Sequence, residues 1–199
     1  MQSFRWDSPR NGPHKYLFIL LQPLFFIKIL FYTYTYYEVN YMWKKYKPYV
    51  LSVAFALLVG GLSAFVTRDN MNIYEKINTP PLSPPGWIFP IVWTVLFILM
   101  GISSARIYIK GKEEGIDVSS ALKTYLWQLG TNFIWSILFF NRQQFFLSFL
   151  WIIALWWLIF TMIKQFKKID PLAAKLQIPY LLWVTFAGYL NFMIWLLNR

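Results

Sequence analysis

The sequence contains no cysteine and only one histidine, His14. Without cysteine, disulfide bonds and thiolate chemistry are excluded. Charged residues are also scarce: they make up 14% of the 199 residues, whereas soluble domains carry about 25%. Because 58% of the residues are hydrophobic and 22% are aromatic, the composition indicates a membrane protein.

From Met42 onward the chain has neither histidine nor cysteine, and every acidic residue falls in a predicted loop. Metal centres need clustered ligands, hydrolysis usually needs a positioned base, and proton-coupled transport normally uses an ionisable group inside the membrane. We therefore expect no metal site, no cofactor and no conventional enzyme. The net charge of +11 comes from short basic clusters between apolar runs, which favours a membrane topology signal over nucleic-acid binding.

Five uncharged runs are each near the ~20 residues that a helix needs to cross a bilayer. They are Pro48–Thr67, Trp87–Ala105, Thr124–Asn141, Gln143–Ile163 and Leu176–Asn198. Segments that cross lipid in this way must be helical, because an unpaired backbone is not tolerated there. The expected fold class is an all-α integral membrane protein with a bundle of five transmembrane helices.

The first 41 residues do not fit this pattern. Tyr16–Leu30 is apolar but is interrupted by Lys28, and no small-residue cleavage site follows it. We favour the hypothesis that residues 1–41 are an upstream extension and that Met42 starts the membrane domain of residues 42–199. The alternative is that they form an extra hydrophobic anchor.

Basic residues predict the orientation of the spans. Eleven flank one side of the predicted membrane, and four (Arg68, Lys76, Arg142 and Arg199) flank the other. The eleven are Lys44, Lys45, Lys47, Arg106, Lys110, Lys112, Lys123, Lys164, Lys167, Lys168 and Lys175. Since basic flanks stay in the cytoplasm, we expect the first loop and the C-terminus outside, and the expected location is the bacterial plasma membrane.

The first loop carries Pro80, Pro81, Pro84 and Pro85 and runs into the second apolar segment. Proline fixes φ and removes a donor, so the loop is predicted to be a stiff lid. Pro90 falls in the first turn of the next helix, where a missing N–H costs little.

Polar residues within the spans are neutral and recur at helical spacing. Gln128, Asn132 and Ser136 share one face of the third predicted helix, with Trp135 beside them. They either hydrogen-bond neighbouring helices or line a ligand site. Close helix packing is the expected role of Gly60 and Gly101.

The last predicted helix has a second stripe at the same spacing. Trp183, Ala187 and Asn191 recur every four residues, and Ala187 leaves room beside Trp183 for a partner helix or a ligand. Most tryptophans are expected at the lipid surface. Trp93 and Trp183 are the two for which we expect a function.

Three groups of residues together resemble the TspO/MBR family, the tryptophan-rich sensory proteins and translocator proteins. The first group is Pro80 with Pro84–Trp87, Pro90 and Val92–Thr94. The second is Gln128–Leu129 with Asn132, Trp135–Ser136 and Leu138–Phe140. The third is Pro179–Tyr180 with Trp183, Phe186–Ala187 and Leu190–Asn191. The resemblance covers residues 42–199 in order.

The resemblance implies a five-helix bundle, often a homodimer, that binds porphyrins or sterol-like molecules in a pocket under the first loop. The implied ligand-binding residues are Tyr74, Pro85, Trp93, Asn132, Trp135, Trp183 and Ala187. Some members degrade porphyrin under light, which implies a catalytic role for Trp93 and Trp183. The expected function is therefore a membrane receptor or sensor. The alternative is a passive carrier of tetrapyrroles or sterol-like lipids.

Overall fold

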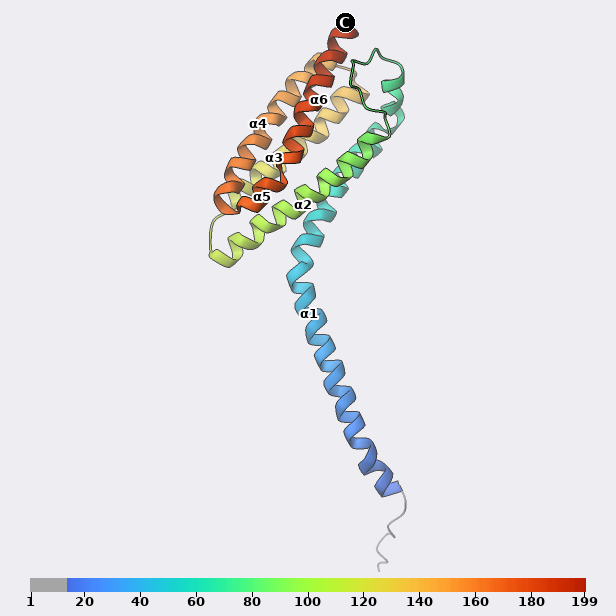
Figure 1. Ribbon diagram of the computed structural model, residues 1–199, viewed down its shortest axis with the longest axis vertical. Helices are drawn as coiled ribbons and strands as arrows, with labels where there is room; N and C mark the ends of the chain where they lie inside the picture. The colour runs from blue at the N-terminus through green and yellow to red at the C-terminus, as the bar shows by residue number, and fades with distance from the viewer. Residues whose placement is uncertain (1–13) are drawn as a thin grey trace, which may run out of the picture. The chain divides into compact units, whose positions relative to one another are not determined.

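The computed structural model describes the backbone of residues 14–199 and the side chains of residue 28 and residues 30–73 and 76–199 (Figure 1). All regular structure in this part of the chain is helical, which confirms the all-α class. The elements, in order, are α1 (His14–Thr67), η1 (Arg68–Glu75), α2 (Ile88–Glu114), α3 (Ser119–Ser136), η2 (Ile137–Asn141), α4 (Phe145–Ile169), α5 (Pro171–Leu176) and α6 (Ile178–Leu197). η1 is a 3₁₀-helix and η2 is a π-helical turn.

The chain divides into two compact units, Met1–Tyr46 and Lys47–Arg199, and the boundary falls inside α1. Pro48 lies two residues past this boundary, where its missing N–H weakens the helix hydrogen bonding. α1 is longer than the expected first span. That span was predicted to begin at Pro48, whereas the 54 residues of α1 start at His14. Within the first unit, the described side chains from Leu30 to Tyr46 are almost all exposed.

In the part of the chain that the structure describes, four segments are long and apolar enough to cross a membrane: Leu30–Ile73, Ile88–Glu114, Phe145–Ile169 and Pro171–Leu197. They correspond to the first, second, fourth and fifth expected spans. The third expected span is helical, as α3 and η2, but is not among these segments, since Gln128, Thr131 and Asn132 lower its hydropathy.

Within the second unit, α4 packs against both α3 and α6 (Figure 1). Its inward face is formed by Leu155, Ile159, Met162 and Phe166, all fully buried. They recur at helical spacing, so one apolar stripe of α4 fills the core between its two neighbours. Two glycines allow α1 to approach α2 closely. A Cβ at Gly101 would overlap the backbone of Val53, and one at Gly60 would overlap the ring of Phe97. The predicted packing role of both glycines is confirmed.

The α5 end of the bundle is closed by an ion pair. Asp170 has an extended backbone, as is usual before proline, and this ends α4 and starts α5. One oxygen of its carboxylate accepts the N–H groups of Leu172 and Ala173, at 2.9 and 3.3 Å, and the other accepts Nε of Arg106 at 2.7 Å. Ser103 Oγ adds a 2.7 Å hydrogen bond to the carbonyl of Ala173. These contacts tie α2 to the break between α4 and α5. Elsewhere, the hydrogen bond that Asp117 accepts from the Ser119 backbone lowers the pKa of Asp117 at the start of α3.

The opposite end is covered by η1 and by residues 76–87, which we call the proline loop. This loop forms no regular helix. It is held by Asn198, whose Oδ1 accepts the Asn78 N–H at 2.9 Å and whose Nδ2 donates to the Asn78 carbonyl at 2.9 Å. Tyr189 Oη also donates to the Pro81 carbonyl at 3.2 Å. Pro90 lies in the first turn of α2, as predicted.

Candidate functional site

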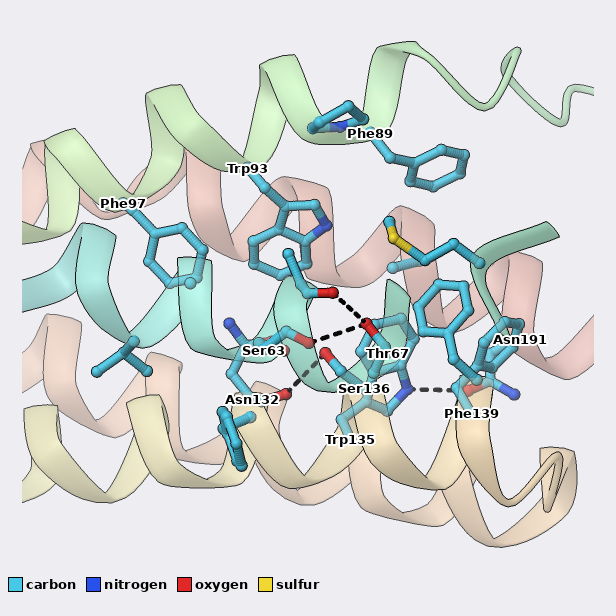
Figure 2. Close-up of a pocket in the computed structure, with 18 of the residues that line it drawn as sticks. Ser63, Thr67, Phe89, Trp93, Phe97, Asn132, Trp135, Ser136, Phe139 and Asn191 are labelled. Carbon is cyan, nitrogen blue, oxygen red and sulfur yellow. Dashed lines mark hydrogen bonds between the residues drawn. The ribbon is translucent and has the colours of Figure 1, made fainter. Parts of the chain in front are cut away.

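The candidate site is a cavity of about 130 Å³ at the proline-loop end of the bundle (Figure 2). Its walls come from α1, α2, α3, η2 and α6, and Met71 of η1 contributes to its lining. None of the lining residues belongs to α4 or to the proline loop. The cavity therefore lies beside the densely packed α3–α4–α6 core, and η1, not the proline residues, provides its lid contact.

Aromatic rings form much of the lining. Trp93 and Phe97 of α2 lie with their ring centroids 5.7 Å apart, and Phe89 lies one turn earlier on the same helix (Figure 2). On α3 and η2, Trp135 stacks on Phe139 at 5.4 Å and 27°. Such surfaces favour a flat, apolar ligand, because ring pairs in these geometries add about 0.5–1.5 kcal/mol each beyond burial.

Trp135 is held in place by Asn191. The Nε1 of Trp135 donates to Asn191 Oδ1 at 3.1 Å (Figure 2), and Asn191 Nδ2 donates to the carbonyl of Phe145 at 2.8 Å. The amide of Asn191 thus joins α3, the start of α4 and α6. Both side-chain polar atoms of Asn191 are hydrogen-bonded within the protein. Asn191 therefore holds the cavity wall in place and has a structural role.

Asn132 differs from Asn191. It is only 5% exposed and lines the same cavity, yet its side-chain amide makes no hydrogen bond with any residue that the structure describes. Only its main-chain carbonyl is engaged, by Ser136 Oγ at 3.4 Å. Protein atoms do not enclose this amide completely, so Asn132 presents an unused donor and acceptor to the cavity.

Thr67 is a further polar residue in the cavity lining. Its hydroxyl donates to the carbonyl of Ser63 in its own helix at 2.9 Å. Asn141 of η2 joins the lid to the bundle: its Oδ1 accepts Nδ2 of Asn70 at 3.0 Å, and its own Nδ2 donates to the Val66 carbonyl at 3.0 Å. η1 is therefore fastened above the cavity by side-chain amides.

Four of the residues predicted to bind ligand line the cavity: Trp93, Asn132, Trp135 and Ala187. Pro85 and Trp183 are not among the lining residues. The ring of Trp183 lies edge-on to Phe89 at 5.9 Å, and its Nε1 is buried without a hydrogen-bonding partner in the described part of the chain. The side chain of Tyr74 lies outside the described residues.

The predicted ligand-binding residues did not include three groups that line the site: Asn191, Ser63 with Thr67, and Phe139 with Phe140. Asn191 was visible as the next member of the Trp183–Ala187 stripe, but its contact with Trp135 joins residues 56 positions apart. Among the side chains that the structure describes (residue 28 and residues 30–73 and 76–199), no three His, Cys, Asp or Glu gather in a group that could hold a metal ion.

Comparison with known proteins gives a consistent result. The family model described as TspO/MBR family matches residues 52–196. The chain is 36% identical over 149 residues to the tryptophan-rich protein TspO of Chlorobaculum tepidum, covering 74% of this chain and 94% of that protein. It is 35% identical over 125 residues to protein CrtK of Rhodobacter capsulatus, covering 63% of this chain and 78% of that protein. It is 34% identical over 159 residues to the translocator protein of Bos taurus, covering 76% of this chain and 92% of that protein.

Proposed function

The chain belongs to the TspO/MBR family and is an integral membrane protein, and from this premise we propose that it is a receptor or sensor for a flat lipophilic ligand of the tetrapyrrole class. The ligand binds in the cavity between α1, α2, α3 and α6. The observation that carries the proposal is the unpartnered amide of Asn132, set among aromatic rings in a buried cavity. Binding sites for small molecules typically combine an apolar lining with a few such polar groups.

α3 with η2 serves as a fifth membrane span in this proposal, despite its lower hydropathy. The polar residues Gln128 and Asn132 are buried inside the bundle, whereas Leu126, Trp127 and Ile134 are exposed on its outer face. A span with this arrangement presents apolar groups to lipid and keeps its amides among protein groups. Gly130 has open space beside it on the outer side, which supports a homodimer formed through close approach of α3 helices.

The basic residues support an orientation. Lys110, Lys112 and Lys123 flank the ends of α2 and α3 nearest α5, so this end of the bundle faces the cytoplasm under the positive-inside rule. The proline loop and the C-terminus would then lie outside the plasma membrane. A ligand would reach the cavity from the outer leaflet or the outer aqueous phase.

Selectivity must come from specific contacts, because a lipophilic molecule already dissolved in the bilayer gains little by moving into an apolar protein site. Stacking on Trp93 and Trp135 selects a flat ring. A hydrogen bond from Asn132 contributes roughly 0.5–1.5 kcal/mol. Carboxylates of a tetrapyrrole would extend toward the lid, where Arg68, Lys76 and Arg142 are exposed.

The cavity of about 130 Å³ is smaller than the roughly 300–1,000 Å³ of sites for drug-sized ligands. A tetrapyrrole therefore requires the lid to open or the helices to separate. Asn141 holds η1 and Asn198 holds the proline loop through amide hydrogen bonds, which can exchange with water at the surface. We propose that ligand entry breaks these contacts and leaves the α3–α4–α6 core unchanged.

Light-dependent porphyrin loss is a second activity of this proposal. Trp93 lines the cavity, so its readily oxidised indole would touch the bound ring. Trp183 does not line the cavity and packs edge-on against Phe89. It would therefore act on the ligand through Phe89, or directly only after the cavity has opened. We therefore expect Trp93→Phe to reduce light-driven porphyrin loss more than Trp183→Phe does.

A porphyrin titration of the purified protein in lipid nanodiscs tests binding. Tryptophan fluorescence should fall saturably with added protoporphyrin IX, beyond the loss seen with empty nanodiscs. Trp93→Phe should keep the affinity within about threefold, because an apolar ring remains, but should reduce the quenching. Trp157→Phe, at a 58% exposed site on α4, is the matched control and should not change the affinity. Quenching that rises linearly without saturation would contradict the proposal.

The carrier alternative is supported by the name translocator protein of the Bos taurus relative. Porphyrin flux into sealed proteoliposomes separates the two functions. A receptor binds without accelerating flux, whereas a carrier accelerates flux in proportion to the amount of protein.

A further inference from the structure

A second group of buried polar side chains lies outside the cavity lining, toward the α5 end of the bundle. On α3, Tyr125 and Gln128 continue the face that carries Asn132, at spacings of three and four residues. On α6, Tyr180 lies seven residues before the cavity residue Ala187, and so on the same face. Tyr125 is 4% exposed, and Gln128 and Tyr180 are fully buried.

Polar atoms of these three side chains lack partners in the described part of the chain: the hydroxyls of Tyr125 and Tyr180, and Oε1 of Gln128. Gln128 makes one weak contact, from its Nε2 to Met100 Sδ at 3.8 Å. The nearby hydroxyl of Ser104 donates to its own helix, at the Gly101 carbonyl, at 3.0 Å. One turn before Tyr180, both side-chain polar atoms of the fully buried Gln177 are also without partners.

These side chains face the same stripe of α2. Gln128 contacts Met100, which lies seven residues after Trp93 on the same face of that helix, and Tyr125 lies one turn before Gln128 on α3. Tyr180 also meets the cavity residue Trp93, edge to face, at 6.1 Å. The group thus occupies one region between α2, α3 and α6, separated from the cavity by the indole of Trp93.

A dry environment does not suit this arrangement. Each unsatisfied buried donor or acceptor costs about 1–3 kcal/mol, and no bulk water is present at this depth in a bilayer. An ion is disfavoured, because the group contains only hydroxyls and amides and no carboxylate to neutralise it. Water is small and neutral, both donates and accepts hydrogen bonds, and typically makes about three of them when buried.

We propose that Tyr125, Gln128 and Tyr180 bind a small cluster of internal water molecules between α2, α3 and α6. This site does not depend on the ligand proposed for the cavity. It makes the polar stripe of α3 continuous, from the amide of Asn132 to the hydroxyl of Tyr125. The bundle then contains a hydrated region directly beneath its apolar cavity.

Water-edited solid-state NMR on the full chain in lipid, with ¹³C-labelled tyrosine and phenylalanine, tests the site directly. The spectra of Tyr125→Phe and Tyr180→Phe assign the two tyrosine signals by loss. Both signals should gain intensity from water at short mixing times. The fully buried Phe166 of the apolar core, assigned by Phe166→Leu, should gain it only slowly. Equally slow transfer to the two tyrosines and to Phe166 would overturn the proposal.

Thermal unfolding provides a second test, because the change in Tm on removing a hydroxyl has opposite signs when the hydroxyl binds water and when it has no partner. If the hydroxyls bind water, Tyr125→Phe and Tyr180→Phe should each lower Tm by about 2–4 °C, because each removes satisfied hydrogen bonds. The double variant should lose less than the sum, because the two hydroxyls share water. Tyr108→Phe, at an exposed site on α2, is the control and should leave Tm unchanged. A rise in Tm for both single variants would show that the hydroxyls are dry orphans and would overturn the proposal.

Discussion

The two ends of the bundle differ in how tightly they are packed and in the bonds that close them. At the α5 end, Arg106 and Asp170 close the structure with a 2.7 Å ion pair, and the fully buried Met162 and Phe166 fill the core of α4. At the proline-loop end, a cavity remains among aromatic rings, and the cover is fastened by asparagine amides at its edges. The α5 end is therefore well packed and closed by an ion pair, whereas the proline-loop end contains a cavity and is closed by neutral hydrogen bonds.

This difference shows where stability and function are separated. A charged pair at a nearly buried site is costly to break, so the α5 end should open rarely. Neutral amide contacts near the surface each contribute only about 1 kcal/mol, so the lid can open while the core stays folded. Changes at the α5 end should therefore alter stability, and changes at the proline-loop end should alter ligand exchange.

The largest expected effect is at the α5 end. Asp170→Ala removes both the partner of Arg106 and the N-cap of α5, and should lower the free energy of unfolding by about 2–4 kcal/mol. Glu114→Ala, which breaks the exposed 3.5 Å pair with Lys110, should cost about 0.5 kcal/mol or less. Thermal and chemical unfolding in the same detergent measure both variants. Equal losses would mean that the α5 end is not held by its ion pair.

A smaller loss is expected where α1 crosses α2. Gly101→Ala inserts a methyl group against the backbone of Val53, which cannot rotate away, and should cost about 1–3 kcal/mol. Gly61→Ala has open space around its new methyl group and should be neutral or stabilising by up to about 1 kcal/mol, because alanine favours helix. The same unfolding measurements decide between these signs. A stabilising Gly101→Ala would show that α1 and α2 do not pack as closely as the structure has them.

At the lid, the expected effect is kinetic. Asn198→Ala removes two hydrogen bonds to the backbone of Asn78, so the proline loop should open about tenfold more often with little change in overall stability. Hydrogen exchange at the Asn78 amide reports the opening without any ligand. Asn72→Ala, at an exposed site on η1, is the control. Unchanged exchange at Asn78 would mean that other contacts hold the loop.

Local patterns in the sequence predicted the helices and part of the site. Apolar length predicted five spans, of which four in the described part of the chain are long and apolar enough to cross a membrane. The spacing of Gln128, Asn132 and Ser136 placed Asn132 on a shared helix face, which lies inward in the structure. The first expected span began at Pro48, because Lys44, Lys45 and Lys47 precede the uncharged run, but the helix of the structure continues through Pro48 and these lysines. For this reason the start of α1 was wrong.

The remaining features depend on contacts between distant residues. Asn198 and Asn78 are 120 residues apart, and no local signal identifies either as a fastening for the loop. Trp183 shares a helix face with Ala187, which suggested the same environment. In the structure the ring of Phe89 from α2 packs against it, and helical periodicity does not show where a ring from another helix will lie.

The central claim is that the amide of Asn132 binds the ligand, whereas the amide of Asn191 stabilises the fold. Replacing each with leucine and measuring both stability and porphyrin affinity tests it most directly. Asn132→Leu removes an amide that has no partner, so Tm should stay constant or rise while affinity falls about three- to tenfold. Asn191→Leu breaks the hydrogen bonds to Trp135 and Phe145, so Tm should fall by several degrees. If Asn132→Leu lowers Tm as much as Asn191→Leu and binds porphyrin normally, the cavity is not the ligand site.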